Sequence, residues 1–155
     1  MGGVRKQHKR YSKPLRLFDS ARIKEEDSII RKYGLKNKRE IWRAEFSISK
    51  VRKEAKGMIN KSEKEQEDFV NRLKGTGFNV KNIDEVLSLK KEDWLERRLQ
   101  TIVLKKGLAK SAREARQMIT HRHIAVSGNI VSIPSFIVSK NLQDAIEIKK
   151  KLKQE

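Results

Sequence analysis

The sequence predicts an α+β fold: a mostly helical N-terminal domain, a small helix-turn-helix-hairpin module after it, and an extended basic arm in front. Three observations predict this fold. Apolar residues recur at helical spacing through residues 19–96, two short β-branched runs follow a Ser-capped helix within residues 97–145, and residues 1–18 hold six cations and no acid. A basic tail, residues 146–155, completes the predicted organisation. The apolar residues from Leu142 to Leu152 could form part of a strand or a final short helix.

The arm, residues 1–18, has no apolar stripe, and Pro14 would interrupt any helix there. Because its cations repel one another, the free arm is expected to be disordered. It either orders along an anionic polymer or remains a solvated tail, and the residues alone leave both readings open.

The helical domain should begin with a helix from about Asp19 to just before Gly34, since glycine commonly follows a helix end. A longer amphipathic helix comes next. Its apolar residues, spaced by three and four over almost five turns, are Ile41, Ala44, Ile48, Val51, Ala55 and Met58. The cations on its opposite side are Arg39, Arg43, Lys50 and Lys53. A solvated face and a polyanion-binding face both explain these cations.

Two shorter helices should close the helical domain. Ser62 and Glu65 have the spacing of a capping box, and the helix that they start should end at Gly75 and Gly77. A short capped segment should then begin at Asn82.

A helix over residues 91–106 should lead into the module. Within it, Arg97 and Arg98 lie where the helical domain meets the module. They are either ion-pair partners between the two parts or phosphate contacts, and the sequence does not choose. Ser111 and Glu114 form a further capping box, in which the Glu114 carboxylate should accept a hydrogen bond from the N–H of Ser111.

The module should finish with a hairpin. Its two β-branched runs are joined by Ser127-Gly128-Asn129, where Gly128 and Asn129 tolerate the positive φ of a tight turn.

Charge is concentrated at two places in a chain of net charge +18. Residues 1–24 and residues 97–138 each hold eight basic residues and one acid, whereas residues 25–96 hold seventeen basic and fifteen acidic residues. This distribution indicates a long anionic partner that is contacted twice. The hydrophobic fraction of 36% indicates two modest cores.

Several classes of protein and site are not expected. The absence of cysteine excludes disulfides and the usual structural zinc ligands. No apolar run approaches the roughly 20 residues that a membrane-spanning helix needs, and no signal-peptide pattern occurs. The protein should therefore be intracellular with no membrane partner. His121 and His123 lack further metal ligands nearby, and no phosphate loop or nucleophile elbow occurs. We therefore expect no enzyme, no metal and no cofactor.

Three segments carry a resemblance to a known family. One is AKSAREARQMITHRHIAVSGNIVSIPSFIV, which resembles the compact RNA-binding module named after the small-subunit ribosomal protein S-four. The others, YGLKNKREIWRAEF and DWLERRLQTIVLKKGLAKS, resemble that ribosomal family itself, in its archaeal and eukaryotic branch. The similarity runs from about residue 6 to about residue 138.

The resemblance implies a structural constituent of the small ribosomal subunit, in the cytoplasm, that binds ribosomal RNA early and nucleates assembly. It implies a position near the channel through which messenger RNA enters, beside protein S-five, where the contact influences translational accuracy. Two alternatives stay open: a ribosome-biogenesis factor of the same superfamily, and a fragment of an RNA-modifying enzyme or synthetase that carries the module.

Candidate RNA contacts come from three parts of the chain. Those that the resemblance assigns to the module are Lys110, Arg113, Arg116, Gln117, His121, Arg122 and His123. The arm and the long helix add Lys6, Lys9, Arg10, Arg39 and Arg43. The boundary adds Arg97 and Arg98 as the alternative to their ion-pair role.

Overall fold

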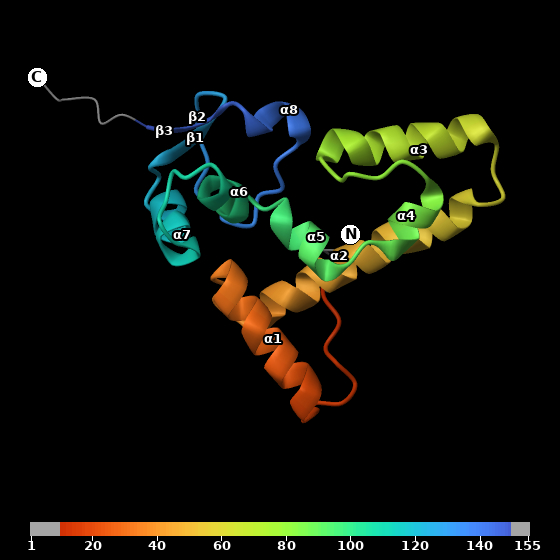
Figure 1. Cartoon of the computed structure of the whole chain (residues 1–155), viewed down its shortest axis with the longest axis horizontal. Coiled ribbons are helices and arrows are strands. Elements are labelled where there is room, and N and C mark those ends of the chain that lie inside the picture. The colour runs from red at the N-terminus through yellow and green to blue at the C-terminus, as the bar shows by residue number, and fades with distance from the viewer. Residues whose placement is uncertain (1–9, 150–155) are drawn as a thin grey trace, which may run out of the picture.

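The computed structural model describes residues 10–149, and within them eight helices and one three-stranded sheet form two joined parts of an elongated molecule (Figure 1). The α+β class is confirmed. Lys6 and Lys9, two of the candidate RNA contacts, lie outside the described residues. Residues 10–18 contain neither helix nor strand. No helix in the described range has both the length and the apolar character that a membrane crossing requires.

The first helix, α1 (Ser20–Tyr33), is bounded as its sequence predicts. The Asp19 carboxylate accepts the N–H groups of Ala21 at 3.1 Å and Arg22 at 3.3 Å, which satisfies amides that have no partner inside the helix. Gly34 ends the helix with a left-handed φ of 59°.

The long helix, α2 (Lys38–Met58), lies at the centre of the helical part and contacts α1. It buries Ile41, Ala44, Ile48 and Ala55, so the predicted apolar stripe is confirmed as its inner face. Its four predicted outer cations are all exposed.

The helix α3 (Glu63–Thr76) is confirmed, but its predicted capping box is wrong. The Ser62 side chain makes no cap hydrogen bond, and the Glu65 carboxylate pairs with Lys61 at 3.2 Å. Gly75 lies inside the helix, and Gly77, with φ 95°, ends it.

The short helix α4 (Ile83–Ser88) begins at Asn82, whose side chain makes no cap hydrogen bond. Glu85 instead accepts the Lys81 N–H at 2.7 Å.

The single helix predicted for residues 91–106 is wrong: two helices, α5 (Lys91–Glu96) and α6 (Leu99–Lys105), occupy this stretch. The break lies where a distant segment pairs with the chain. Arg97 O accepts the Val138 N–H at 3.0 Å, and Leu99 N–H donates to Phe136 O at 2.7 Å. This strand-like pairing takes backbone groups that a continuous helix would use, and Arg98 adopts an extended ψ of 142°.

The module continues with α7 (Ala112–Thr120), β1 (Ile124–Val126), β2 (Asn129–Ile130), α8 (Lys140–Gln143) and β3 (Ile146–Ile148). The sheet order is β2-β1-β3, with both pairings antiparallel. In the hairpin turn, Ser127 and Gly128 have positive φ, whereas Asn129 already belongs to β2. The positive φ values predicted for Gly128 and Asn129 therefore lie one residue earlier, at Ser127 and Gly128.

The third strand lies just past residue 145, where the module was expected to end. Of the strand and the short helix left open for this stretch, the strand forms: Ile146 pairs with Val126 and Ile148 with Ile124. The sheet therefore extends past residue 145. The remainder of the predicted tail, residues 150–155, lies outside the described residues.

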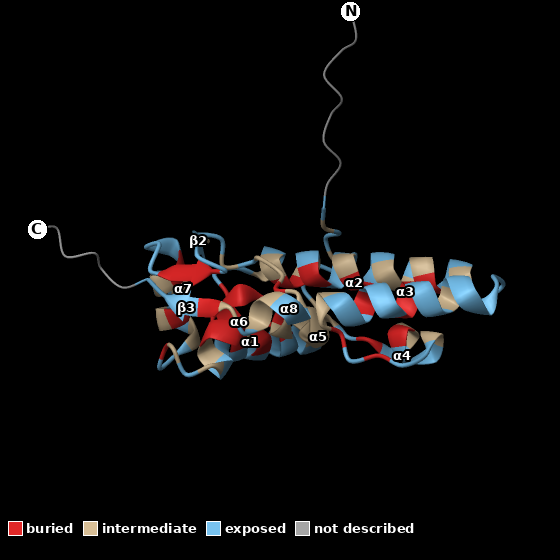
Figure 2. Ribbon diagram, turned by 90° about the horizontal axis from the view of Figure 1, so that it is seen from above, coloured by how far each residue is buried: buried red, intermediate tan, exposed pale blue. Residues whose placement is uncertain are grey.

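Buried residues form three clusters rather than the two expected cores, and they run along the interior of the molecule (Figure 2). One surrounds Ile124 in the module, and a second surrounds Phe69 between α2, α3 and α4. The third joins Ile29 of α1, Ile41 of α2 and Leu95 of α5. The third cluster forms where α5 and α1 both pack on α2.

Candidate nucleic-acid interface

The module presents one polar face built on α7. This helix buries Ala115 and Ile119, so helical periodicity turns Arg113 and Gln117 outward. Lys110, in the turn before the helix, is exposed as well. The predicted face is therefore present at these positions.

The N-terminal cap of α7 differs in one bond from its prediction. The Ser111 hydroxyl accepts the Glu114 N–H at 3.2 Å, as predicted. The Glu114 carboxylate accepts the N–H of Lys110 at 2.7 Å, one residue before the cap residue that was expected to donate. Glu114 thereby fixes the backbone of Lys110 beside the polar face.

The turn after α7 carries His121, Arg122 and His123, all exposed. Arg122 takes a left-handed φ of 62°, while its N–H donates to Ile119 O at 3.0 Å and the His123 N–H donates to Met118 O at 2.9 Å. The two imidazoles stack with centroids 6.2 Å apart and planes 4° from parallel. The tight turn therefore presents two parallel rings and a guanidinium to solvent.

The second candidate surface lies on α2. Its residues Arg39 and Arg43 are exposed, and the Arg39 guanidinium lies 5.4 Å from the ring centre of Tyr11. Tyr11 in turn stacks on Trp42 at 6.3 Å. Arg10, the first described residue of the arm, is exposed next to this stack. Aromatic stacking therefore fixes the described end of the arm on α2, beside the helix's cations.

Two predicted contacts, Arg98 and Arg116, are engaged inside the protein instead. Arg98 donates to Glu40 Oε2 at 2.5 Å, and Arg116 donates to Glu40 Oε1 at 3.0 Å. Their side chains are 5% and 26% exposed, against 13% for Glu40. Arg98 therefore makes the ion pair between the helical part and the module, which is one of the two roles open for it, and Arg116 shares this pair. Both guanidinium groups are directed to the junction with Glu40.

The electrostatics of Glu40 follow from this pairing. Burial alone would raise the pKa of the Glu40 carboxyl, but hydrogen bonds from Arg116 and Arg98 outweigh burial and hold its pKa below the usual value. Glu40 is therefore a carboxylate at neutral pH.

Arg97 is also engaged within the fold. It is half-buried and donates to Val138 O at 2.6 Å and to Gln143 Oε1 at 3.1 Å. Its guanidinium passes so close to Gly77 that a Cβ built there would lie 2.3 Å from it. Burial lowers the pKa of Arg97 from its usual value. Arg97 thus connects the end of α3 to the module.

Sequence reasoning missed two residues of this junction, Glu40 and Gln100. Gln100 is 1% exposed, and its Nε2 donates to Tyr33 O at 3.0 Å, Gly34 O at 3.1 Å and Ala112 O at 2.8 Å. These bonds tie the end of α1 to the start of α7. A glutamine between the apolar Leu99 and Ile102 was the available signal, but backbone acceptors have no sequence signature.

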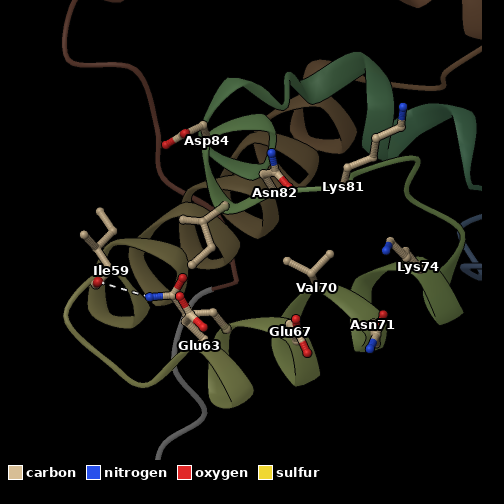
Figure 3. A pocket seen from close by; sticks show the side chains of 11 residues that line it. Ile59, Glu63, Glu67, Val70, Asn71, Lys74, Lys81, Asn82 and Asp84 are labelled. Atoms are coloured by element: carbon tan, nitrogen blue, oxygen red, sulfur yellow. Dashed lines mark hydrogen bonds between the residues drawn. The ribbon is translucent and has the colours of Figure 1, made fainter.

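A hollow of about 730 Å³ lies between α3 and the start of α4 (Figure 3). Charges of both signs line it, including Glu63, Glu67 and Lys74. The lining holds no serine or threonine that could act as a nucleophile and no histidine that could act as its base. No group of three metal-ligating side chains occurs within residues 10–149.

Comparisons with known proteins identify the module of this chain as an S4 domain. The S4 domain family model matches residues 97–144, the part that carries the α7 face and the histidine turn. The small ribosomal subunit protein uS4 of Methanothermobacter thermautotrophicus is 41% identical over 152 residues, spanning 94% of this chain and 89% of that relative. The uS4 protein of Thermoplasma acidophilum is 43% identical over 156 residues, spanning 94% and 78%. Similarity of this extent confirms the resemblance seen in the sequence, and the chain belongs to the family of the small ribosomal subunit protein uS4.

Proposed function

We propose that this protein is a structural RNA-binding constituent of the small ribosomal subunit, with ribosomal RNA as its partner. The observation that carries the proposal is the exposed polar face inside the matched S4 domain. Its members, from α7 and the turns on either side of it, are Lys110, Arg113, Gln117, His121, Arg122 and His123.

The physical mechanism is neutralisation of phosphates by cations held on a rigid frame. Residues 97–138 carry eight basic residues and one acid, and three of the basic residues, Lys110, Arg113 and Arg122, lie on this face. Such contacts bind RNA mainly by its shape and backbone, and the two parallel imidazoles add flat surfaces on which an unpaired base can stack.

The exposed cations of α2, together with Arg10, form a second surface for the same RNA. Glu40 and Gln100 hold α2, α1 and α7 against one another, so the two surfaces keep a fixed relative position. A fixed pair of cationic surfaces suits an RNA whose helices already meet at a set angle.

The more specific role follows from the family resemblance. It consists of early binding that nucleates subunit assembly, and a cytoplasmic position beside protein S-five near the channel through which messenger RNA enters. The exposed isoleucines of the sheet region, Ile130, Ile133 and Ile148, supply an apolar surface of the kind that a protein neighbour needs.

The test compares RNA affinity among three variants of matched charge. Arg113→Gln and Arg122→Gln should each weaken binding to small-subunit ribosomal RNA by about 1–3 kcal/mol, or about 5- to 150-fold. Arg31→Gln removes one exposed arginine from α1, outside both surfaces, and should change affinity far less. Equal effects of all three substitutions would mean that only total charge matters, which would remove the module face from the interface.

A cellular experiment separates the proposed constituent from a biogenesis factor. Crosslinking from cells should place the α7 face on small-subunit ribosomal RNA, and the protein should remain stoichiometric in mature, translating subunits. Loss of the protein from mature subunits would favour a factor that acts only on precursors.

A further inference from the structure

A recess of about 290 Å³ lies between the start of α2, the end of α5 and the module, on the line where the two parts meet. It is separate from the α7 face. Its charged lining consists of five cations and one acid: Lys36, Arg39, Arg43, Arg98, Arg116 and Glu40.

The acid in this recess is already fully paired. Glu40 accepts hydrogen bonds from Arg98 and Arg116 and from the backbone N–H of Lys36 at 3.1 Å. The side chains of Lys36, Arg39 and Arg43 have no acidic partner within 4.0 Å among residues 10–149. The recess therefore has a surplus of positive charge that the described protein does not neutralise.

A buried donor in the recess is also unused. Arg98 is 4% exposed, yet its Nε has no hydrogen-bond partner among the described residues. An unpaired buried N–H is costly, and a guanidinium usually finds acceptors for its donors when it is removed from water. Since Arg98 lines the recess, an acceptor that entered it would satisfy this donor after a shift of the side chain.

The backbone adds to the same preference. Lys36 and Asn37 bring the N-terminus of the 21-residue helix α2 to the recess. The Asn37 side chain makes no cap hydrogen bond, and the Glu40 N–H donates to Asn37 O at 3.2 Å. Among the described residues, the N–H groups of Lys38 and Arg39 at the start of α2 are thus left available. The positive end of a helix dipole and its free amides favour an anion.

We propose that this recess binds one phosphate group, which in the ribosomal particle is a phosphodiester of the RNA backbone. The inference deepens the proposed function and rests on it for the source of the phosphate. Arg43 and Lys36 bind the phosphate from the rim, and Arg98 supplies a buried donor. Because Arg98 and Arg116 come from the module side and α2 from the helical part, a phosphate bound here joins the two parts.

Free inorganic phosphate provides the first test, on the full chain and without RNA. At constant ionic strength, each tenfold rise in phosphate above its Kd should raise the melting temperature by about 3–6 °C, with chloride as the reference anion. Arg43→Gln and Lys36→Gln should lose this shift, whereas Arg31→Gln, which removes the same charge elsewhere, should keep it. The same shift in all variants would mean an adventitious ion only and would overturn the proposal.

RNA provides the second test and separates this site from the α7 face. The slope of log affinity against log salt should fall by about 0.7–0.9 for Arg43→Gln, the change expected when the protein neutralises one phosphate fewer. An unchanged slope would overturn the RNA source even if free phosphate binds. Arg113→Gln should weaken RNA binding and leave the phosphate-dependent melting shift intact.

The two proposals therefore fail separately. If Arg113→Gln weakens RNA binding while Arg43→Gln changes neither the melting shift nor the salt slope, the recess proposal is wrong. Arg43 would then also be removed from the proposed α2 surface, while the α7 face of the proposed function stands. If neither variant affects RNA affinity but Arg43→Gln abolishes the phosphate shift, the recess binds phosphate and the proposed RNA interface is wrong. A melting shift with an oligoglutamate peptide but none with phosphate would overturn the phosphate chemistry in favour of an acidic protein partner.

Discussion

Replacing Glu40 by glutamine should destabilise the protein strongly, because it leaves a buried positive charge without its partner. Gln keeps the shape of the side chain but removes the charge that Arg98, 5% exposed, and Arg116, 26% exposed, now share. Breaking a buried ion pair by removing one partner costs about 3–5 kcal/mol. We take about 3 kcal/mol for Glu40→Gln, because the amide oxygen can still accept one hydrogen bond and because Arg116 is partly solvated.

Urea unfolding in phosphate-free buffer measures this loss, and a lower transition midpoint at an unchanged slope is expected. Glu54→Gln is the matched control. The partner of Glu54, Arg72, is 63% exposed, so this surface pair should contribute only about 0–1 kcal/mol. If Glu40→Gln cost no more than Glu54→Gln, the Arg98–Glu40–Arg116 junction would not hold the two parts together.

The pH dependence gives the same reasoning a second check. The folded pKa of Glu40 is lower than its ordinary value, so its stabilisation is fully present above the ordinary value of about 4.5. It should be lost as the pH falls through the lower, folded pKa. The stability difference between the wild type and Glu40→Gln should therefore shrink as the solution is made more acidic than about pH 4.5. A constant difference would assign the effect to packing.

Three further perturbations test other features of the fold. Gln100→Leu leaves buried backbone carbonyls unpaired and should cost about 1–3 kcal/mol in urea unfolding, whereas Gln117→Leu on the exposed face should cost much less. Gly34→Ala should lower the melting temperature, because φ is 59° and the new Cβ would lie 2.8 Å from a side chain of α7, while Gly57→Ala, in open space within α2, should not. Ultraviolet titration should show a tyrosine of pKa about 12 that is absent in Tyr33→Phe, because burial and then nearby acids raise the pKa of the Tyr33 phenol. The stability that comes from this raised pKa is present below about pH 10 and is lost as the pH rises through 12.

Local patterns in the sequence were sufficient for much of the fold. The carboxylate of Asp19, the left-handed Gly34 and the three-and-four spacing on α2 each depend on residues within a few positions of one another. Their hydrogen bonds and periodicity are therefore readable from a short stretch. The exposed positions of Arg113 and Gln117 follow from the same periodicity of α7.

The errors share a different cause, which is competition from distant residues. The helix predicted over residues 91–106 is broken by backbone pairing with residues 136–138, about forty positions away. Arg116 has helical spacing typical of an outer face, but Glu40, 76 positions away in sequence, pairs with it at the junction.

The sequence by itself therefore determined the class of fold, the positions of several helix ends, and the concentration of positive charge in the arm and the module. Only the tertiary structure decided which of those charges face solvent, where the chain between the two parts bends, and how five cations come to surround one carboxylate in a single recess. The physical reason is range. Helix caps and periodicity involve bonds between near neighbours, whereas burial brings remote groups together and changes which partner each polar group takes.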